Sequence, residues 1–139
     1  IELAEEINQG MPPYVSRRLQ DLLNNHSKAV RGSTVLLLGV TYKANISDRR
    51  ESPSVPLAKK LLDLGCTLQY HDPYVENWTV DGRAIGRVDD LTAGISQADA
   101  VIVVQAHREY VNAAGVIDRS ETPTLDTTGK FSGANVERL

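Results

Sequence analysis

The chain has 139 residues, of which 41% are hydrophobic and 24% are charged, as in an ordinary globular protein with one core. A formal net charge of −3 provides no general attraction to nucleic acids or anionic membranes, and no apolar run or signal peptide indicates a membrane or export. The single cysteine, Cys66, excludes a disulfide framework and a cysteine-rich zinc site. We therefore expect no nucleic-acid partner, no membrane partner and a reducing, cytoplasmic location.

The first 28 residues have the pattern of an amphipathic helix. Because proline is unfavourable inside a helix, Pro12 and Pro13 predict a kink or restart, with the better helix running from Pro12 to about His26. The apolar residues of this helix form a long stripe along one face, and we expect this stripe to pack on a second subunit or a preceding domain. The chain also begins inside this helix without Met, so we expect the N-terminal part of a longer protein to be missing. The apolar residues recur at steps of three or four: Leu3, Ile7, Met11, Val15, Leu19 and Leu22.

A buried strand, a polar loop and a second helix follow. The apolar run Thr34–Leu38 predicts a strand covered on both faces, and Gly39 ends it. After the loop, Ser52 is expected to cap a helix that has Pro53 in its first turn. Gly65 is expected to terminate that helix.

The second half of the chain continues the alternation of strands and helices. Residues 74–90 are irregular or hold a short hairpin at Asp81-Gly82. The remaining predicted elements are a strand at Thr67–His71, a turn at Asp72-Pro73, a helix at Leu91–Ala98, a strand at Ala100–Val104, a helix at Glu109–Asp118 and a strand at Thr124–Thr127.

This order predicts an α/β fold with a parallel sheet and helices on both faces, preceded by the long N-terminal helix. In such sheets, ligands bind beyond the carboxyl ends of the strands. The loops after Leu38, His71, Val104 and Thr127 are therefore the candidate binding loops.

The loop from Gly39 to Pro53 is the strongest candidate. Lys43, Arg49 and Arg50 lie within eight residues, just before a helix N-terminus that itself attracts anions. Each charge-assisted hydrogen bond to a diphosphate would contribute roughly 1.5–3 kcal/mol. A solvated polar loop is the alternative, but the position and the cation spacing favour binding. The loop matches neither the G-x-G-x-x-G dinucleotide pattern nor a Walker A loop.

The remaining reactive side chains favour structural roles. Cys66 lies at the amino end of its strand, away from the expected site, and is interpreted as a buried thiol. His26, His71 and His107 lack a metal-binding spacing; His71 and His107 follow strands and could line one crevice, although a hydrogen-bonded structural role is favoured for each. Since the carboxylates are also scattered, no metal site and no catalytic residue are predicted.

Four motifs together resemble the UDP-glucose/GDP-mannose dehydrogenase family. They cover nearly the whole chain: I-N-x-x-M-P-x-Y-V at Ile7–Val15, G-V-T-Y-K-x-N-x-x-D-x-R-E-S-P at Gly39–Pro53, Y-H-D-P-Y-V at Tyr70–Val75, and D-A-V-I-V-V-x-x-H-x-E-Y at Asp99–Tyr110.

The resemblance implies a part of an NAD-dependent nucleotide-sugar 6-dehydrogenase, which oxidises the sugar C6 alcohol to a carboxylate in polysaccharide biosynthesis. Family members have an N-terminal Rossmann domain that binds NAD, a central helical part with the dimer interface and catalytic cysteine, and a C-terminal Rossmann-like domain that binds UDP. Residues 1–30 would be the tail of the central part and residues 31–139 the C-terminal UDP-sugar-binding domain. The expected partners are a UDP-sugar, the missing Rossmann domain and a second copy through the N-terminal helix. The chain alone is expected to be inactive.

The resemblance also assigns roles to single residues. Tyr42 and Lys43 match substrate contacts, and Arg50 matches an arginine that reaches NAD held mainly by the missing domain. Thr128 stands where the family often has a substrate-contacting arginine, and Lys130 is a possible replacement. UDP-N-acetylglucosamine, UDP-N-acetylmannosamine and UDP-glucose are the candidate substrates. The alternative is a non-catalytic α/β module that binds nucleotides or mediates interactions.

Overall fold

A six-stranded sheet forms the centre of the protein in the computed structural model, which describes the backbone of residues 2–41 and 52–139 and the side chains of residues 12–41 and 52–139. Every pairing within it is parallel. The strands lie in the order β5 (Gly86–Arg87), β2 (Thr67–His71), β1 (Thr34–Leu38), β6 (Ala100–Val103), β7 (Thr124–Asp126) and β8 (Val136–Arg138).

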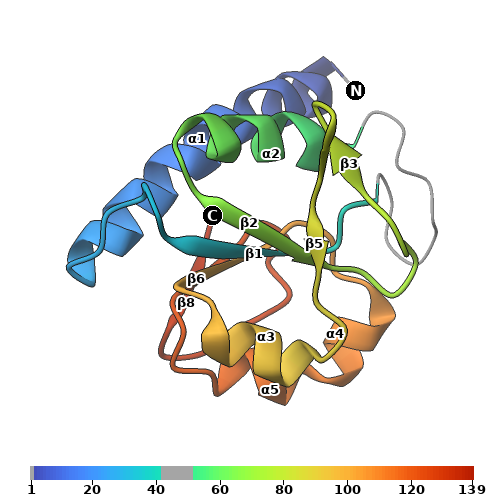
Figure 1. Ribbon diagram of the computed structural model, residues 1–139. Coiled ribbons are helices and arrows are strands. Elements are labelled where there is room, and N and C mark those ends of the chain that lie inside the picture. Colours follow the sequence, from blue (N-terminus) through green and yellow to red (C-terminus); the bar gives the residue numbers. More distant parts are fainter. Residues whose placement is uncertain (1, 42–51) are drawn as a thin grey trace.

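Helices cover both faces of the sheet (Figure 1). One layer consists of α1 (Glu2–Asn25) and α2 (Ser54–Asp63), and the other of α3 (Leu91–Gln97), α4 (Arg108–Asn112) and α5 (Ala114–Asp118). Because strand side chains alternate between faces, Val35 and Leu37 join the core under α1 and α2, whereas Leu36 and Leu38 join the core on the opposite face. The predicted three-layer α/β fold is confirmed.

Helix α1 is continuous through both prolines, so the predicted restart is wrong. Each proline costs about 3 kcal/mol inside a helix. Against this, Val15, Leu19 and Leu23 are completely buried in the core shared with α2 and the sheet, at roughly 1.5–3 kcal/mol each. The stripe residues Val15, Leu19 and, in part, Leu22 are therefore covered by the chain itself, together with Leu23, which was not in the predicted stripe. The side chains of Leu3, Ile7 and Met11 lie outside the described residues.

The end of α2 matches the sequence signal, and its start lies one residue later than predicted, with Pro53 as the N-cap. The helix begins at Ser54, one residue after the helical Pro53, and Ser52 Oγ accepts the backbone N–H of Ser54 at 3.2 Å. At the other end Gly65 adopts φ +90°. The N–H groups of Gly65 and Cys66 donate to the carbonyls of Leu62 and Leu61, which is the Schellman arrangement.

The remaining differences concern short elements. The helix predicted at 109–118 is divided into α4 and α5 at Ala113, which leaves helical geometry with ψ +29°. The predicted hairpin is present as β3 (Thr79–Val80) and β4 (Arg83–Ala84). Strands β5 and β8, at the sheet edges, were not predicted. Among the described helices, none combines the length and apolarity needed to cross a membrane.

Candidate functional site

Gly39 brings the first candidate loop against the loop that follows β6. Its φ of +79° is unfavourable for other residues, and a Cβ at this position would lie 2.7 Å from the Gln105 carbonyl oxygen. Strands β1 and β6 are neighbours, and the chain leaves them in opposite directions across the sheet. Ligands bind at such a point in doubly wound sheets, so we place the candidate site at the carboxyl ends of β1, β2 and β6.

The carboxylate of Asp72 joins three loops beneath this edge. Its Oδ2 accepts the backbone N–H of Val40 at 2.8 Å and His107 Nε2 at 3.0 Å, while its Oδ1 accepts the N–H of Tyr74 at 2.8 Å. Thr41 Oγ1 lies 3.4 Å from the same His107 nitrogen. The side chains of Asp72 and His107 are both completely buried. The structural role favoured for His107 is confirmed.

The burial of Asp72 also bears on whether this domain could bind a dinucleotide. In Rossmann domains that bind NAD, an acidic side chain near the end of the second strand accepts ribose hydroxyls. Asp72 directly follows β2, but its side chain is inaccessible and its two oxygens bond inside the protein. Since Gly39 is also the only glycine of the G-x-G-x-x-G pattern present, the described residues do not fit NAD in the Rossmann manner.

Tyr110 and His71 form a second hydrogen-bonded pair at the same edge. The Tyr110 hydroxyl donates to the His71 carbonyl at 2.6 Å, and His71 Nδ1 lies 2.8 Å from the Tyr110 oxygen. Burial raises the pKa of the Tyr110 phenol, so it stays a donor at neutral pH. Burial first, and then the nearby Arg87 guanidinium, lower the pKa of His71. The imidazole is consequently neutral at pH 7.

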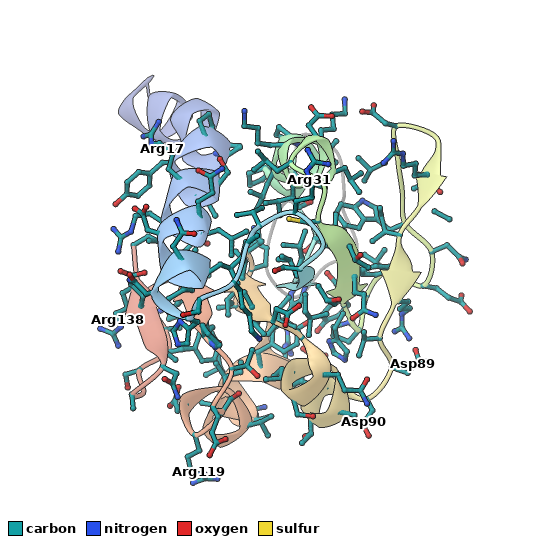
Figure 2. All side chains as sticks on the ribbon, turned by 60° about the vertical axis from the view of Figure 1, so that its left-hand side comes forward. Arg17, Arg31, Asp89, Asp90, Arg119 and Arg138 are labelled. Atoms are coloured by element: carbon teal, nitrogen blue, oxygen red, sulfur yellow. The ribbon has the colours of Figure 1, made fainter. Side chains whose placement is uncertain are left out.

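Arg87 holds the turn after β2. Its Nε and Nη2 donate to the carbonyls of Val75 and Asp72, at 3.1 and 3.2 Å, and its Nη1 pairs with Asp89. Of the other arginines, Arg17, Arg119 and Arg138 lie well apart on the surface (Figure 2). These arginines therefore form no common patch for a diphosphate.

The loop after β7 is built around Asp126, a buried carboxylate. It accepts the backbone N–H groups of Thr128 and Phe131, at 2.8 and 3.0 Å, and the Thr128 hydroxyl at 2.6 Å. Thr128 Oγ1 in turn accepts the Lys130 N–H. The Thr128 side chain thus makes its hydrogen bonds within its own loop, whereas the Lys130 side chain is exposed to solvent.

The residues predicted to contact ligands lie outside the described part of the chain: Tyr42, Lys43 and Arg50. Glu51 and Arg49 do so as well. The loop ends that are described, Thr41 and Ser52, are both buried. Cys66 is buried at the amino end of β2, as predicted, and burial raises the pKa of its thiol to about 11. No group of three potential metal ligands occurs in residues 12–41 and 52–139.

A separate hollow of about 400 Å³ lies between α3 and α5, lined in part by Ile95, Arg119 and Thr122. Thr122 precedes β7, so this hollow is on the side of the amino ends of the strands. Doubly wound sheets bind ligands at the opposite edge.

The sequence interpretation missed two features of the site. Asp72 was assigned to a turn, and the structure confirms the turn but adds the bonds to Val40 and His107. An acidic residue directly after the second strand was the available signal. The pairing of Tyr110 with His71 had no such signal, because it depends on how α4 packs against β2.

Comparison with known proteins agrees with this geometry. Residues 36–131 match the profile of the UDP-glucose/GDP-mannose dehydrogenase family, UDP binding domain. The chain belongs to this family. It is 30% identical over 112 residues to the UDP-N-acetyl-D-mannosamine dehydrogenase of Methanocaldococcus jannaschii, covering 81% of this chain. It is 32% identical over 104 residues to the UDP-N-acetyl-D-glucosamine 6-dehydrogenase of Salmonella typhi, covering 75% of this chain.

The solved structures show the same relationship. The NDP-N-acetyl-D-galactosaminuronic acid dehydrogenase from Methanosarcina mazei superposes with a TM-score of 0.77 at 25% identity, covering 99% of this chain and 30% of that one. The chain spans 24% of the length of both curated relatives. Its similarity to these family members therefore covers between 24% and 30% of each of them.

Proposed function

We propose that this chain is the C-terminal, UDP-sugar-binding domain of an NAD-dependent nucleotide-sugar 6-dehydrogenase. The match of residues 36–131 to the family's UDP binding domain carries the proposal. The architecture supports it, since the matched region contains the loops at the carboxyl ends of β1, β2 and β6.

Within this proposal, the loop after β1 contacts the substrate. Tyr42 and Lys43 bind the UDP-sugar, and Arg50 reaches NAD that is held mainly by a separate N-terminal Rossmann domain. That division is supported by the buried Asp72, which leaves the present domain without the acidic ribose contact of a NAD site. Lys130 is proposed to supply the charge of the arginine that Thr128 replaces.

At the level of the whole protein, the proposal covers oxidation of the sugar C6 alcohol to a carboxylate in cytoplasmic polysaccharide biosynthesis. The relatives named above act on UDP-N-acetylmannosamine and UDP-N-acetylglucosamine according to their names, which supports a UDP-N-acetylhexosamine substrate here. We assign residues 1–30 to the tail of the central helical part and residues 31–139 to the UDP-sugar domain. A homodimer would form through the N-terminal helix.

Titration calorimetry of the 139-residue chain with UDP tests the binding role. We expect saturable UDP binding, with ADP much weaker. The substitution Lys43→Ala should weaken UDP binding about ten- to hundredfold, because it removes a charge-assisted contact of roughly 1.5–3 kcal/mol. Lys59→Ala is the matched control, since Lys59 lies on α2 and pairs with Asp81. Equal affinities for UDP and ADP, or none for either, would contradict the proposal and favour a non-catalytic interaction module.

A second test addresses the proposal that the cofactor site and the catalytic cysteine lie in other parts of the protein. The chain alone should form no NADH from NAD and any of the three UDP-sugars, because the proposal assigns both the cofactor site and the catalytic cysteine to other parts of the protein. NADH formation by the purified chain would show this division to be wrong.

A further inference from the structure

The hydroxyl of Tyr110 determines which nitrogen of His71 carries the proton. This hydroxyl has one hydrogen, and it is given to the His71 carbonyl, which can only accept. The contact of 2.8 Å between the Tyr110 oxygen and His71 Nδ1 therefore requires a proton on Nδ1. In a neutral imidazole the other nitrogen, Nε2, is then a hydrogen-bond acceptor.

The acceptor on His71 is accessible. Nε2 makes no hydrogen bond with any described residue, and His71 is not among the residues with further contacts. Across the described part of the chain, no completely buried side-chain nitrogen or oxygen lacks a partner, so Nε2 retains some solvent-accessible surface. His71 is half-buried at the end of β2, its ring centroid lies 5.5 Å from that of Tyr110, and the charge of Arg87 acts on it.

The position of this nitrogen indicates what it binds. Doubly wound domains that bind a dinucleotide hold a ribose close to the end of the second strand; in this domain the Asp72 carboxylate at that end is buried and bonded, which leaves its neighbour as the available side chain. His71 is the adjacent residue, so its free acceptor lies at the same end of β2. A neutral ring nitrogen with a lone pair repels phosphate oxygens, which are themselves acceptors, but receives a hydroxyl.

We propose that His71 Nε2 accepts a hydrogen bond from a ribose hydroxyl of the bound nucleotide. The inference rests on the proposed UDP-binding function and adds a contact outside the loop after β1. Its partner is a sugar hydroxyl rather than the diphosphate.

Deoxynucleotides test the contact without altering the protein. The unmodified chain is titrated with UDP, 2′-deoxy-UDP and 3′-deoxy-UDP. We expect one of the deoxynucleotides to bind about five- to tenfold more weakly than UDP, the loss of one hydrogen bond to a site that otherwise remains intact. Equal affinity for all three ligands would overturn the ribose contact and leave the proposed function standing. Absence of UDP binding would overturn both.

Two substitutions then separate the roles of the ring nitrogens. His71→Asn keeps a donor near Nδ1 for Tyr110 but removes Nε2, so it should bind UDP about five- to tenfold more weakly and lose the discrimination against the deoxynucleotide. His71→Gln retains an acceptor near Nε2 and should keep the discrimination. His26→Asn is the matched control, because His26 is exposed just after α1 and its Nδ1 contacts, within the described part of the chain, only the backbone carbonyl of Leu22. If His71→Asn still discriminates like the unmodified chain, the proposal is wrong.

Discussion

Asp72 shows how much of this site depends on one buried side chain. Its carboxylate receives a nitrogen donor from each of three loops, those after β1, β2 and β6. Because a buried polar group without a partner costs about 1–3 kcal/mol, none of these donors is easily released. The two carboxylate oxygens of Asp72 therefore fix the positions of Val40 and Tyr74.

Asp72→Asn should destabilise the protein by roughly 2 kcal/mol. The amide retains one oxygen and introduces two hydrogens, so at least one of the three donors loses its acceptor. Urea unfolding at pH 7 measures the effect. Asp90→Asn is the matched control, because Asp90 caps α3 from an exposed position and asparagine caps a helix equally well. Equal unfolding midpoints for the two variants would contradict this account of Asp72.

The thiol of Cys66 should be unreactive in the folded protein. Burial raises its pKa to about 11, so only about one thiol in a thousand is ionised at pH 8. A thiol reagent such as DTNB should then label the chain only after denaturation. In a Ser96→Cys variant, the new thiol at an exposed position on α3 should react at once. Immediate labelling of Cys66 would show that it is accessible.

At the scale of the elements, α1 is part of the domain that follows it. Val15, Leu19 and Leu23 contribute to the same core as β1, β2 and α2. Arg18 pairs with Glu137 of β8, which connects α1 to the last strand of the sheet. The helix therefore needs no second subunit to bury its C-terminal half, and the homodimer through the N-terminal helix stays a proposal.

Leu19→Ala should destabilise the chain by about 2–5 kcal/mol, since Leu19 is completely buried and its truncation leaves a cavity. Leu22→Ala, in the same helix but at a half-buried position, should cost clearly less. Thermal unfolding by circular dichroism compares the two. If both variants melt together, α1 does not pack on the domain as described.

The sequence predicted the central elements because each has its own local signal. Thr34–Leu38 and Thr67–His71 match β1 and β2 to the residue, and Gly65 marked the end of α2 correctly. Pro12 and Pro13 misled the prediction, because tertiary burial of α1 outweighs their local cost. Strands β5 and β8, two and three residues long, are too short to have a periodic pattern. They exist only because a neighbouring strand offers free hydrogen-bonding groups.

The candidate site was predicted less completely for a similar reason. The loop from Gly39 to Pro53 was recognisable as a continuous motif, although Tyr42, Lys43 and Arg50 stay predictions. The pairs formed by Asp72 with His107 and by His71 with Tyr110 join residues 35 and 39 positions apart. Such contacts depend on strand order and helix packing, which local sequence does not encode.

For the whole molecule, the pKa of His71 links stability to pH. Burial and then Arg87 lower this pKa from its ordinary value of 6.5, against the weaker opposing effects of Asp72 and Asp89, while His107 lowers it slightly. The unfolded chain therefore binds a proton more readily than the folded chain. The contribution of His71 is fully present above pH 6.5 and is lost as the pH falls from 6.5 through the folded pKa.

Urea midpoints measured from pH 8 to pH 4 should accordingly decrease below pH 6.5. His71→Asn has no titrating ring at this position, so its midpoint should decrease less over the same range. If the series is extended below pH 4, a second decrease is expected from pH 3.8 downward, because the unfolded chain then protonates Asp99, whose pKa in the folded chain is lowered mainly by Lys28. Parallel curves for the two proteins between pH 6.5 and pH 5 would contradict the assignment to His71.

The spatial order of the strands has a consequence for biosynthesis. Strand β1 lies between β2 and β6, and Val35 pairs with Ala100, 65 positions later in the chain. During translation, Leu36 and Leu38 cannot be fully covered until β6 and the helices after it have left the ribosome. Within this domain the central strand is thus made early and completed late, and its apolar face stays uncovered while the residues between β1 and β6 are made.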